Sequence, residues 1–186
     1  MGTLDPIKTQ IKDGSIIKLR SGGLEDASAL MEYESGVFKT SPYVITEPDE
    51  FKPNIEKQKD RIKGFLEAEG GILILALYGG KIIGNIDLRN NGSRRRIAHR
   101  GSFGMSVSQE FRGRGVGKAL LLALIEWCKR ENNPIEKIEL GVLSENEAGI
   151  GLYESLGFKR EGLVEKAAKV GDKYIDEMHM GLWVGK

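Results

Sequence analysis

The chain has 186 residues, 40% hydrophobic and 30% charged, which is enough for one globular domain with a buried core. Its 28 lysines and arginines nearly balance 27 acidic residues. The resulting net charge of +1 argues against a broad nucleic-acid footprint, which needs a clustered excess of positive charge.

The N-terminal residues 1–13 lack the apolar core of a signal peptide, and the longest apolar run, 119–125, is too short to span a bilayer. The single cysteine, Cys128, permits no internal disulfide and fits a reducing compartment. We therefore expect a cytoplasmic protein with no nucleic-acid or membrane partner. Residues 1–13 are expected to be a loose leader, and residues 14–186 a single domain.

Apolar periodicity and turn residues predict alternating strands and helices. In chain order we expect a strand at 15–20, helices at 25–37 and 54–69, strands at 72–78, 81–89 and 97–107, a helix at 116–131, a strand at 135–143, a helix at 145–156, and a hairpin of strands at 158–166 and 173–183. Three consecutive arginines, 94–96, are expected in a solvated loop. This order predicts a mixed α/β (α+β) sheet with an antiparallel meander and a central strand–helix–strand crossover.

The stretch QEFRGRGVGKALL places three glycines between a predicted strand and a predicted helix. The P-loop pattern fails there, because Arg112 replaces its first glycine and Ala119 its magnesium-binding Ser or Thr. The dinucleotide pattern G-x-G-x-x-G fails at Lys118. The pattern [QR]-x-x-G-x-[GA] fits without a gap at Arg112, Gly115 and Gly117.

A glycine turn at the start of a helix is suited to binding a diphosphate. Backbone N–H groups can converge on the anion, and the positive end of the helix adds to their attraction. Arg112, Arg114 and Lys118 can add charge-assisted hydrogen bonds. The alternative is that the glycines only let the helix and strand pack closely. His99 and His179 lie 80 positions apart with no cysteine pattern, so we expect no metal.

Two segments, FGMSVSQEFRGRGVGKALL and SENEAGIGLYESLGFKREG, resemble the GNAT superfamily of acetyl-CoA-dependent N-acetyltransferases, and the resemblance covers about residues 15–183. It implies a GNAT-like, mostly antiparallel sheet of about seven strands flanked by about four helices. It also implies that acetyl-CoA binds as cosubstrate. The residues implied are Met105 and Val107 for the pantetheine arm, Arg112, Gly113, Arg114, Gly115, Val116, Gly117 and Lys118 for the diphosphate, Asn146 for the pantetheine, and Tyr153 for the thioester sulfur.

The activity implied is transfer of an acetyl group from acetyl-CoA to a primary amine by direct attack in a ternary complex. The ending EG…GDKYIDEMHM resembles the branch that acetylates small amines, amino acids or protein N-termini. An open strand edge can offer N–H donors to the developing oxyanion, and a tyrosine can protonate the leaving thiolate. The alternative is a non-catalytic acyl-CoA-binding or regulatory domain. A homodimer through the edges of the C-terminal hairpin is a further expectation from the family.

The sequence offers several candidates for the amine side of the site. An alkylamine must lose a proton at a cost of about 4.6 kcal/mol at pH 7, whereas an α-amine pays only about 1 kcal/mol. Candidate proton acceptors are Glu34, Asp87, His99 and Glu139, and candidate acceptor-side residues are Tyr33, Tyr174 and Asp176. Gly141 stands where some members that acetylate N-termini carry a glutamate, so that position offers no base.

Two of the implied cofactor residues also have structural interpretations. Asn146 could cap the helix 145–156, although Ser144 and Glu147 match a capping box there. Tyr153 shares a helix face with Ile150, so it could serve only in packing.

Overall fold

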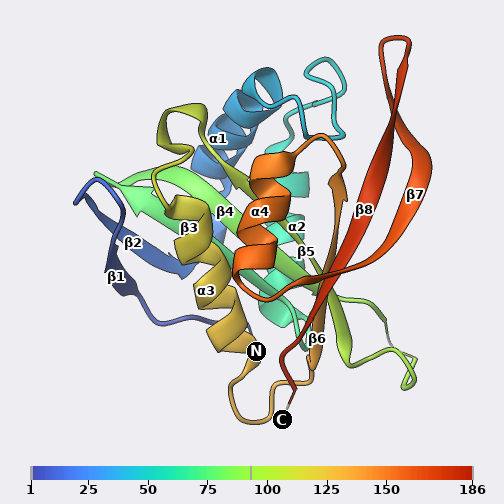
Figure 1. Ribbon diagram of the computed structural model, residues 1–186. Coiled ribbons are helices and arrows are strands. Elements are labelled where there is room, and N and C mark those ends of the chain that lie inside the picture. Colours follow the sequence, from blue (N-terminus) through green and yellow to red (C-terminus); the bar gives the residue numbers. More distant parts are fainter. Residues whose placement is uncertain (1, 93, 186) are drawn as a thin grey trace.

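The computed structural model describes residues 2–92 and 94–185, in which eight strands form one sheet in the order β1-β2-β3-β4-β5-β6-β8-β7 (Figure 1). The strands are β1 (Ile7–Gln10), β2 (Ile16–Ser21), β3 (Ile72–Tyr78), β4 (Lys81–Asn90), β5 (Arg100–Val107), β6 (Lys137–Leu143), β7 (Lys159–Val170) and β8 (Lys173–Trp183). The helices are α1 (Ala27–Thr40), α2 (Ile55–Glu67), α3 (Val116–Cys128) and α4 (Glu147–Ser155). Neighbouring strands are antiparallel except β5 and β6. The predicted fold class is confirmed.

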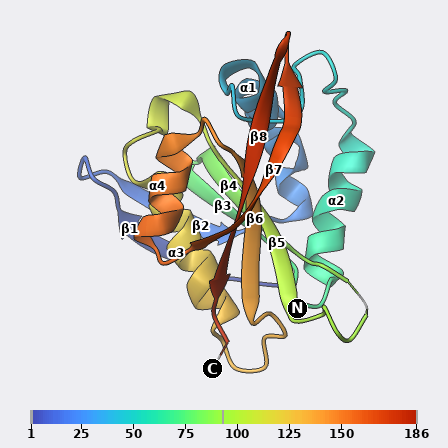
Figure 2. The same cartoon turned by 45° about the vertical axis from the view of Figure 1, so that its right-hand side comes forward.

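The sheet separates two hydrophobic clusters. Helices α3 and α4 cover one face, and α1 and α2 cover the other (Figure 2). Side chains alternate along each strand, so Ile72 and Ile74 of β3 pack toward α3, while Leu73 and Leu75 pack toward α1 and α2. Helix α3 buries most of its circumference, as its sequence predicts, and gives the glycine turn before it a rigid support.

The prediction of a loose leader is wrong for residues 7–10. These residues form β1, which pairs antiparallel with β2 at one edge of the sheet. The sheet therefore has eight strands, where about seven were expected. Leu4 and Ile11, on either side of β1, are buried in the α3 cluster, which holds the segment in place. Residues 1 and 186, which begin the predicted leader and end the predicted domain, lie outside the described residues.

Strands β5 and β6 separate soon after they meet. Their parallel pairing covers only Arg100–Ser102 against Lys137–Glu139. Beyond these residues β5 stays paired with β4 and β6 with β8, so the facing edges of β5 and β6 are unpaired toward their C-terminal ends. The turn before α3 follows β5 and the turn before α4 follows β6, so both helices begin at this open end.

The long β7–β8 hairpin extends beyond the helices at one end of the molecule (Figure 1). The predicted solvated loop of arginines 94–96 is confirmed, since these residues are exposed between β4 and β5. None of the helices in the described parts of the chain is long and apolar enough to cross a membrane.

Candidate active site

The glycine turn adopts backbone conformations that side chains disfavour. Gly113 has φ +73° and Gly115 has φ +96°, both in the left-handed region. Gly115 is the N-cap of α3, and its carbonyl accepts the N–H of Ala119 at 3.0 Å. The N–H groups of residues 116–118 lie in the first helical turn and have no helical acceptor. These groups lie where the sequence predicts an anion site, and free N–H groups at the start of a helix suit an anion.

Gly117 has a different role from the two glycines before it. A Cβ there would lie 3.3 Å from Leu152 Cδ2 and 3.5 Å from Met105 Cε. Its missing side chain therefore lets α3 begin close against α4 and β5. The packing interpretation of the glycines holds at Gly117. At Gly113 and Gly115 the positive φ angles are the reason that glycine is favoured.

The three predicted cations of the turn have different surroundings. Arg112 donates to the carbonyls of Val107 and Thr40, each at 3.1 Å, so it ties the turn to the end of α1. Arg114 forms an ion pair with Asp13 and lies 4.7 Å over the Phe111 ring.

Lys118 differs from both arginines. Its side chain is exposed and has no hydrogen-bond or ion-pair partner within residues 2–92 and 94–185. Of the three predicted cations, its charge is therefore the one available to a ligand.

Tyr153 enters from α4 on the α3 side of the sheet. Its ring packs edge-on against Phe103 of β5, with 5.8 Å between centroids, and also against Phe158. Burial raises the pKa of Tyr153 to about 12, so the phenol stays protonated at neutral pH. The hydroxyl makes no hydrogen bond with any part of the chain that the structure describes. The packing interpretation is thus correct for the ring, while the hydroxyl keeps a proton to donate.

Asn146 is the N-cap of α4. Its Oδ1 accepts the Gly149 N–H at 2.9 Å, so the capping box expected from Ser144 and Glu147 is not the one that forms. The side-chain amide sits at the C-terminal end of β6, where the two strands have separated.

A buried polar cluster lies on the opposite face, under α1 and α2. Glu34 pairs with Arg61 and accepts from Gln58 Nε2 at 3.1 Å. Asp87 of β4 faces the same cluster. Burial raises the pKa of Asp87, Arg89 and Arg61 oppose that rise, and the charge of Glu34 adds to it.

Beside this cluster, a hydrogen-bond chain crosses from α1 to the sheet. Tyr33 Oη lies 2.8 Å from Ser106 Oγ, which donates to Asn85 Oδ1 at 2.6 Å. Burial raises the pKa of Tyr33. Asn85 was missed from the sequence, although its signal is present, because Asn85 and Asp87 alternate with buried Ile86 in the strand GNIDLR.

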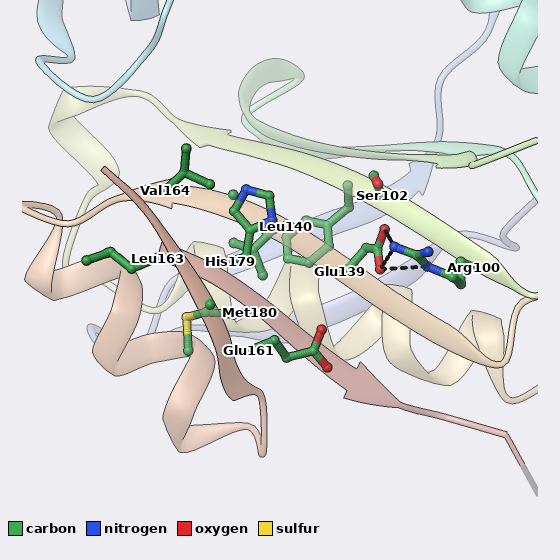
Figure 3. A pocket seen from close by; sticks show the side chains of 12 residues that line it. Arg100, Ser102, Glu139, Leu140, Glu161, Leu163, Val164, His179 and Met180 are labelled. Carbon is green, nitrogen blue, oxygen red and sulfur yellow. Dashed lines mark hydrogen bonds and ion pairs between the residues drawn. The ribbon is translucent and has the colours of Figure 1, made fainter. Parts of the chain in front are cut away.

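The same face contains a cavity of about 380 Å³ over β5, β6, β7 and β8 (Figure 3). Figure 3 shows Ser102, Glu139 and His179 on one side of the sheet and Met180 on the other. Arg100 binds Glu139 through Nε and Nη2 at 3.0 and 2.8 Å, and Asn91 Nδ2 donates to the same carboxylate at 2.6 Å.

Two predicted residues lie apart from this arrangement. His99 precedes β5 at its closed end, with its ring 6.4 Å from that of Trp183. The length of β5, roughly 25 Å, separates it from the glycine turn. Tyr174 is exposed near the tip of the β7–β8 hairpin, where Lys169 lies 5.5 Å over its ring. Neither residue is brought together with Tyr153.

Comparison with known proteins gives matches over most of the chain. The profile of the acetyltransferase (GNAT) family matches residues 35–158. L-amino acid N-acetyltransferase AaaT of Escherichia coli is 31% identical over 107 residues, 58% of this chain and 65% of that protein. N-acetylaspartate synthetase of Xenopus tropicalis is 34% identical over 101 residues, 54% of this chain and 35% of that protein. The matches thus span less than two thirds of either relative's length.

Solved structures show the same fold. A GNAT-family acetyltransferase from Streptococcus pneumoniae superposes with a TM-score of 0.86 at 25% identity, covering 91% of this chain and 99% of that one. The yncA protein of Salmonella typhimurium, solved with its cofactor acetyl-CoA, superposes with a TM-score of 0.80 at 18% identity, covering 91% and 95% of the two chains.

Proposed function

Because this chain belongs to the acetyltransferase (GNAT) family, we propose that it transfers the acetyl group of acetyl-CoA to a primary amine by direct attack in a ternary complex. One observation carries the proposal. The unpaired end of β5 leads to the free N–H groups at the start of α3, and the Tyr153 ring packs against Phe103 of β5. A helix N-terminus that suits an anion, an open strand edge and a proton donor thus all adjoin β5.

The residues present fit acetyl-CoA, which supplies an activated thioester. The first-turn N–H groups of α3 and the ammonium of Lys118 would hold the diphosphate. The free edge of β5 at Met105 and Val107 would hydrogen-bond the amides of the pantetheine, as would the Asn146 side chain. The acetyl group would then lie where β5 and β6 separate, near Tyr153.

The chain's own groups can perform the transfer. Backbone N–H groups on the open β5 edge are fixed donors for the charge that develops on the carbonyl oxygen. Tyr153 remains protonated and can give its proton to the leaving thiolate. The amine would approach from the opposite face, which carries Asp87, Glu34 and the cavity beside Glu139.

We propose the α-amine of an amino acid or of a peptide N-terminus as the acceptor. The two relatives that carry the names L-amino acid N-acetyltransferase and N-acetylaspartate synthetase support an amino acid. At pH 7 an α-amine loses its proton at a cost of about 1 kcal/mol, against about 4.6 kcal/mol for a lysine-like amine.

We also propose that two copies pair through β7. This strand ends the sheet, and its residues are exposed along nearly its whole length, including Leu163 and Val164. Light scattering coupled to size exclusion would measure the mass. A monomer at high protein concentration would contradict this pairing without bearing on catalysis.

The first test is calorimetric titration with acetyl-CoA of the wild type and of Gly115→Trp. The matched control is Gly171→Trp, because Gly171 also has a positive φ, +60°, but lies in the β7–β8 turn, where a Cβ would meet no atom within 4 Å. We expect micromolar binding that only the Gly115 variant loses. No binding by the wild type would refute the proposal. If acetyl-CoA binds but no amine causes release of the CoA thiol, a non-catalytic acyl-CoA-binding domain would be favoured.

A further inference from the structure

Gly141 has no side chain on β6, and the space beside it is occupied by the side chain of Glu177 on the neighbouring strand β8. A Cβ at Gly141 would lie 2.5 Å from both Cδ and Oε1 of Glu177, a distance that real atoms do not tolerate. The Glu177 carboxylate therefore lies directly over the Gly141 backbone. A side chain on β6 at this position would displace the carboxylate, so the carboxylate from β8 occupies the place that such a side chain would take.

His179 lies next to this carboxylate on the same face of β8. Its Nε2 is 2.8 Å from Glu177 Oε1. An ionised carboxylate can only accept, so Nε2 carries the hydrogen and donates it. The tautomer is thereby fixed with a free lone pair on Nδ1. The ring also lines the cavity, where Figure 3 shows it beside Val164.

The position of this pair relative to β5 gives it a role. His179 is the register partner of Gly141, which lies two residues past Glu139, the last residue of β6 that pairs with β5. The pair thus borders the point where the strands separate, on the face opposite Tyr153. Resting on the function proposed above, we infer that His179 accepts the proton of the attacking amine and that Glu177 positions and stabilises the histidine.

The other acidic groups on this face are already engaged or enclosed. Glu139 is bound by Arg100 and Asn91, and Glu34 by Arg61 and Gln58, so their lone pairs face donors within the protein. The imidazole of His179 is half exposed, with 53% of its side-chain surface accessible, so it can pass a proton to water. Charged groups around it are Glu177 on β8, Glu139 and Lys137 on β6, Arg100 on β5, and Glu161 on β7.

The proton balance is complete with this assignment. An ammonium acceptor loses one proton before the nitrogen attacks and a second as the amide forms. The C–N bond forms, the C–S bond breaks, one proton finishes on the thiol through Tyr153, and the other leaves through His179 to solvent. An α-ammonium gives up its proton more readily than a lysine-like ammonium, whose pKa is about 2.6 higher, so a histidine base suits an α-amine.

The test compares His179→Gln and Glu177→Gln with His99→Gln, a control at the other histidine of the chain. The measurement is kcat against pH, because kcat reports ionisation in the enzyme–substrate complex. We expect His179→Gln to lose about 100-fold in kcat and the acidic limb of the profile, with acetyl-CoA affinity unchanged. Glu177→Gln should lose about 10-fold in kcat, because the imidazole loses the carboxylate that fixes its tautomer and orientation. His99→Gln should stay within two-fold of the wild type.

Nitrogen NMR of the His99→Gln protein provides a second readout, since one histidine signal remains. It should show hydrogen on Nε2 and none on Nδ1 at a pH above the limb. If His179→Gln keeps both kcat and its acidic limb while the wild type acetylates amines, the inference is wrong and the proposed function stands. If the wild type turns over no amine, both are wrong.

Discussion

Lys118 provides a sharp test of how the diphosphate is held. In the parts of the chain that the structure describes, Arg114 is paired with Asp13 and Arg112 is tied to α1, which leaves Lys118 as the cation of the turn that has no protein partner. Its attraction to one phosphate charge at about 4 Å lies between about 1 kcal/mol in water and about 4 kcal/mol at an effective dielectric constant of 20. Exposure favours the lower end, so two charges give about 1.5–2 kcal/mol.

Lys118→Met should therefore raise the Kd of acetyl-CoA by about 10- to 30-fold, measured by calorimetry. The matched control is Lys129→Met, which removes the same charge from the C-cap of the same helix. Lys129 lies 11 residues after Lys118, which is about 16 Å along the helix and twice the Debye length at physiological salt. We expect less than a two-fold change in Kd for Lys129→Met. Raising the salt concentration should bring the Kd of Lys118→Met for acetyl-CoA closer to that of the wild type.

A charge-neutral pair of substitutions tests the remaining arginine. Asp13→Asn with Arg114→Met removes the ion pair without changing the net charge. Because an exposed pair contributes little, we expect nearly wild-type affinity. If this double variant weakens acetyl-CoA binding more than Lys118→Met does, Arg114 leaves Asp13 to bind the diphosphate. The assignment of the diphosphate charge to Lys118 would then be refuted.

Three other predictions follow from buried ionisable groups. Tyr153→Phe should lower kcat by about 100-fold with little change in KM for acetyl-CoA, and should reduce the loss of stability that the wild type shows as pH rises from 10 toward 12. Asp87→Asn should raise stability to urea at pH 7, because the raised pKa means that ionised Asp87 opposes folding, and the gain should vanish below about pH 4. Cys128, whose pKa burial raises to about 12, should react with Ellman's reagent at pH 8 only after unfolding.

The sequence was informative wherever the function depends on neighbours in the chain. The glycine turn, the helix that starts from it and the Tyr153 helix are local features, and residues 109–121 alone contain the free N–H groups and Lys118. The strands 72–78 and 81–89 were also predicted almost to the residue, because Gly79 and Gly80 fix the turn between them.

Features that depend on distant contacts could not be predicted in this way. Arg114 was expected to face the ligand, but its partner is Asp13, 101 positions earlier, in a segment expected to be loose. The capping of α4 depended on which of two nearby side chains reached the free N–H groups, and Asn146 did so. His179 gave no signal of its own, since its significance comes from the register that places it beside Gly141.

The alternation of side chains along β5 separates two tasks that the reaction requires. Phe103 and Met105 face α3 and α4, where Tyr153 and Gly117 lie, while Ser102 and Ser106 face the cavity and the α1 cluster. The proposed cofactor path and the proposed acceptor face are thus formed by interleaved residues of one strand. A substitution at an even position can change the acceptor with little effect on the cofactor contacts. Gly141, Glu177 and His179 all lie on the proposed acceptor face, so β8 can supply the proposed proton acceptor without contacting Tyr153.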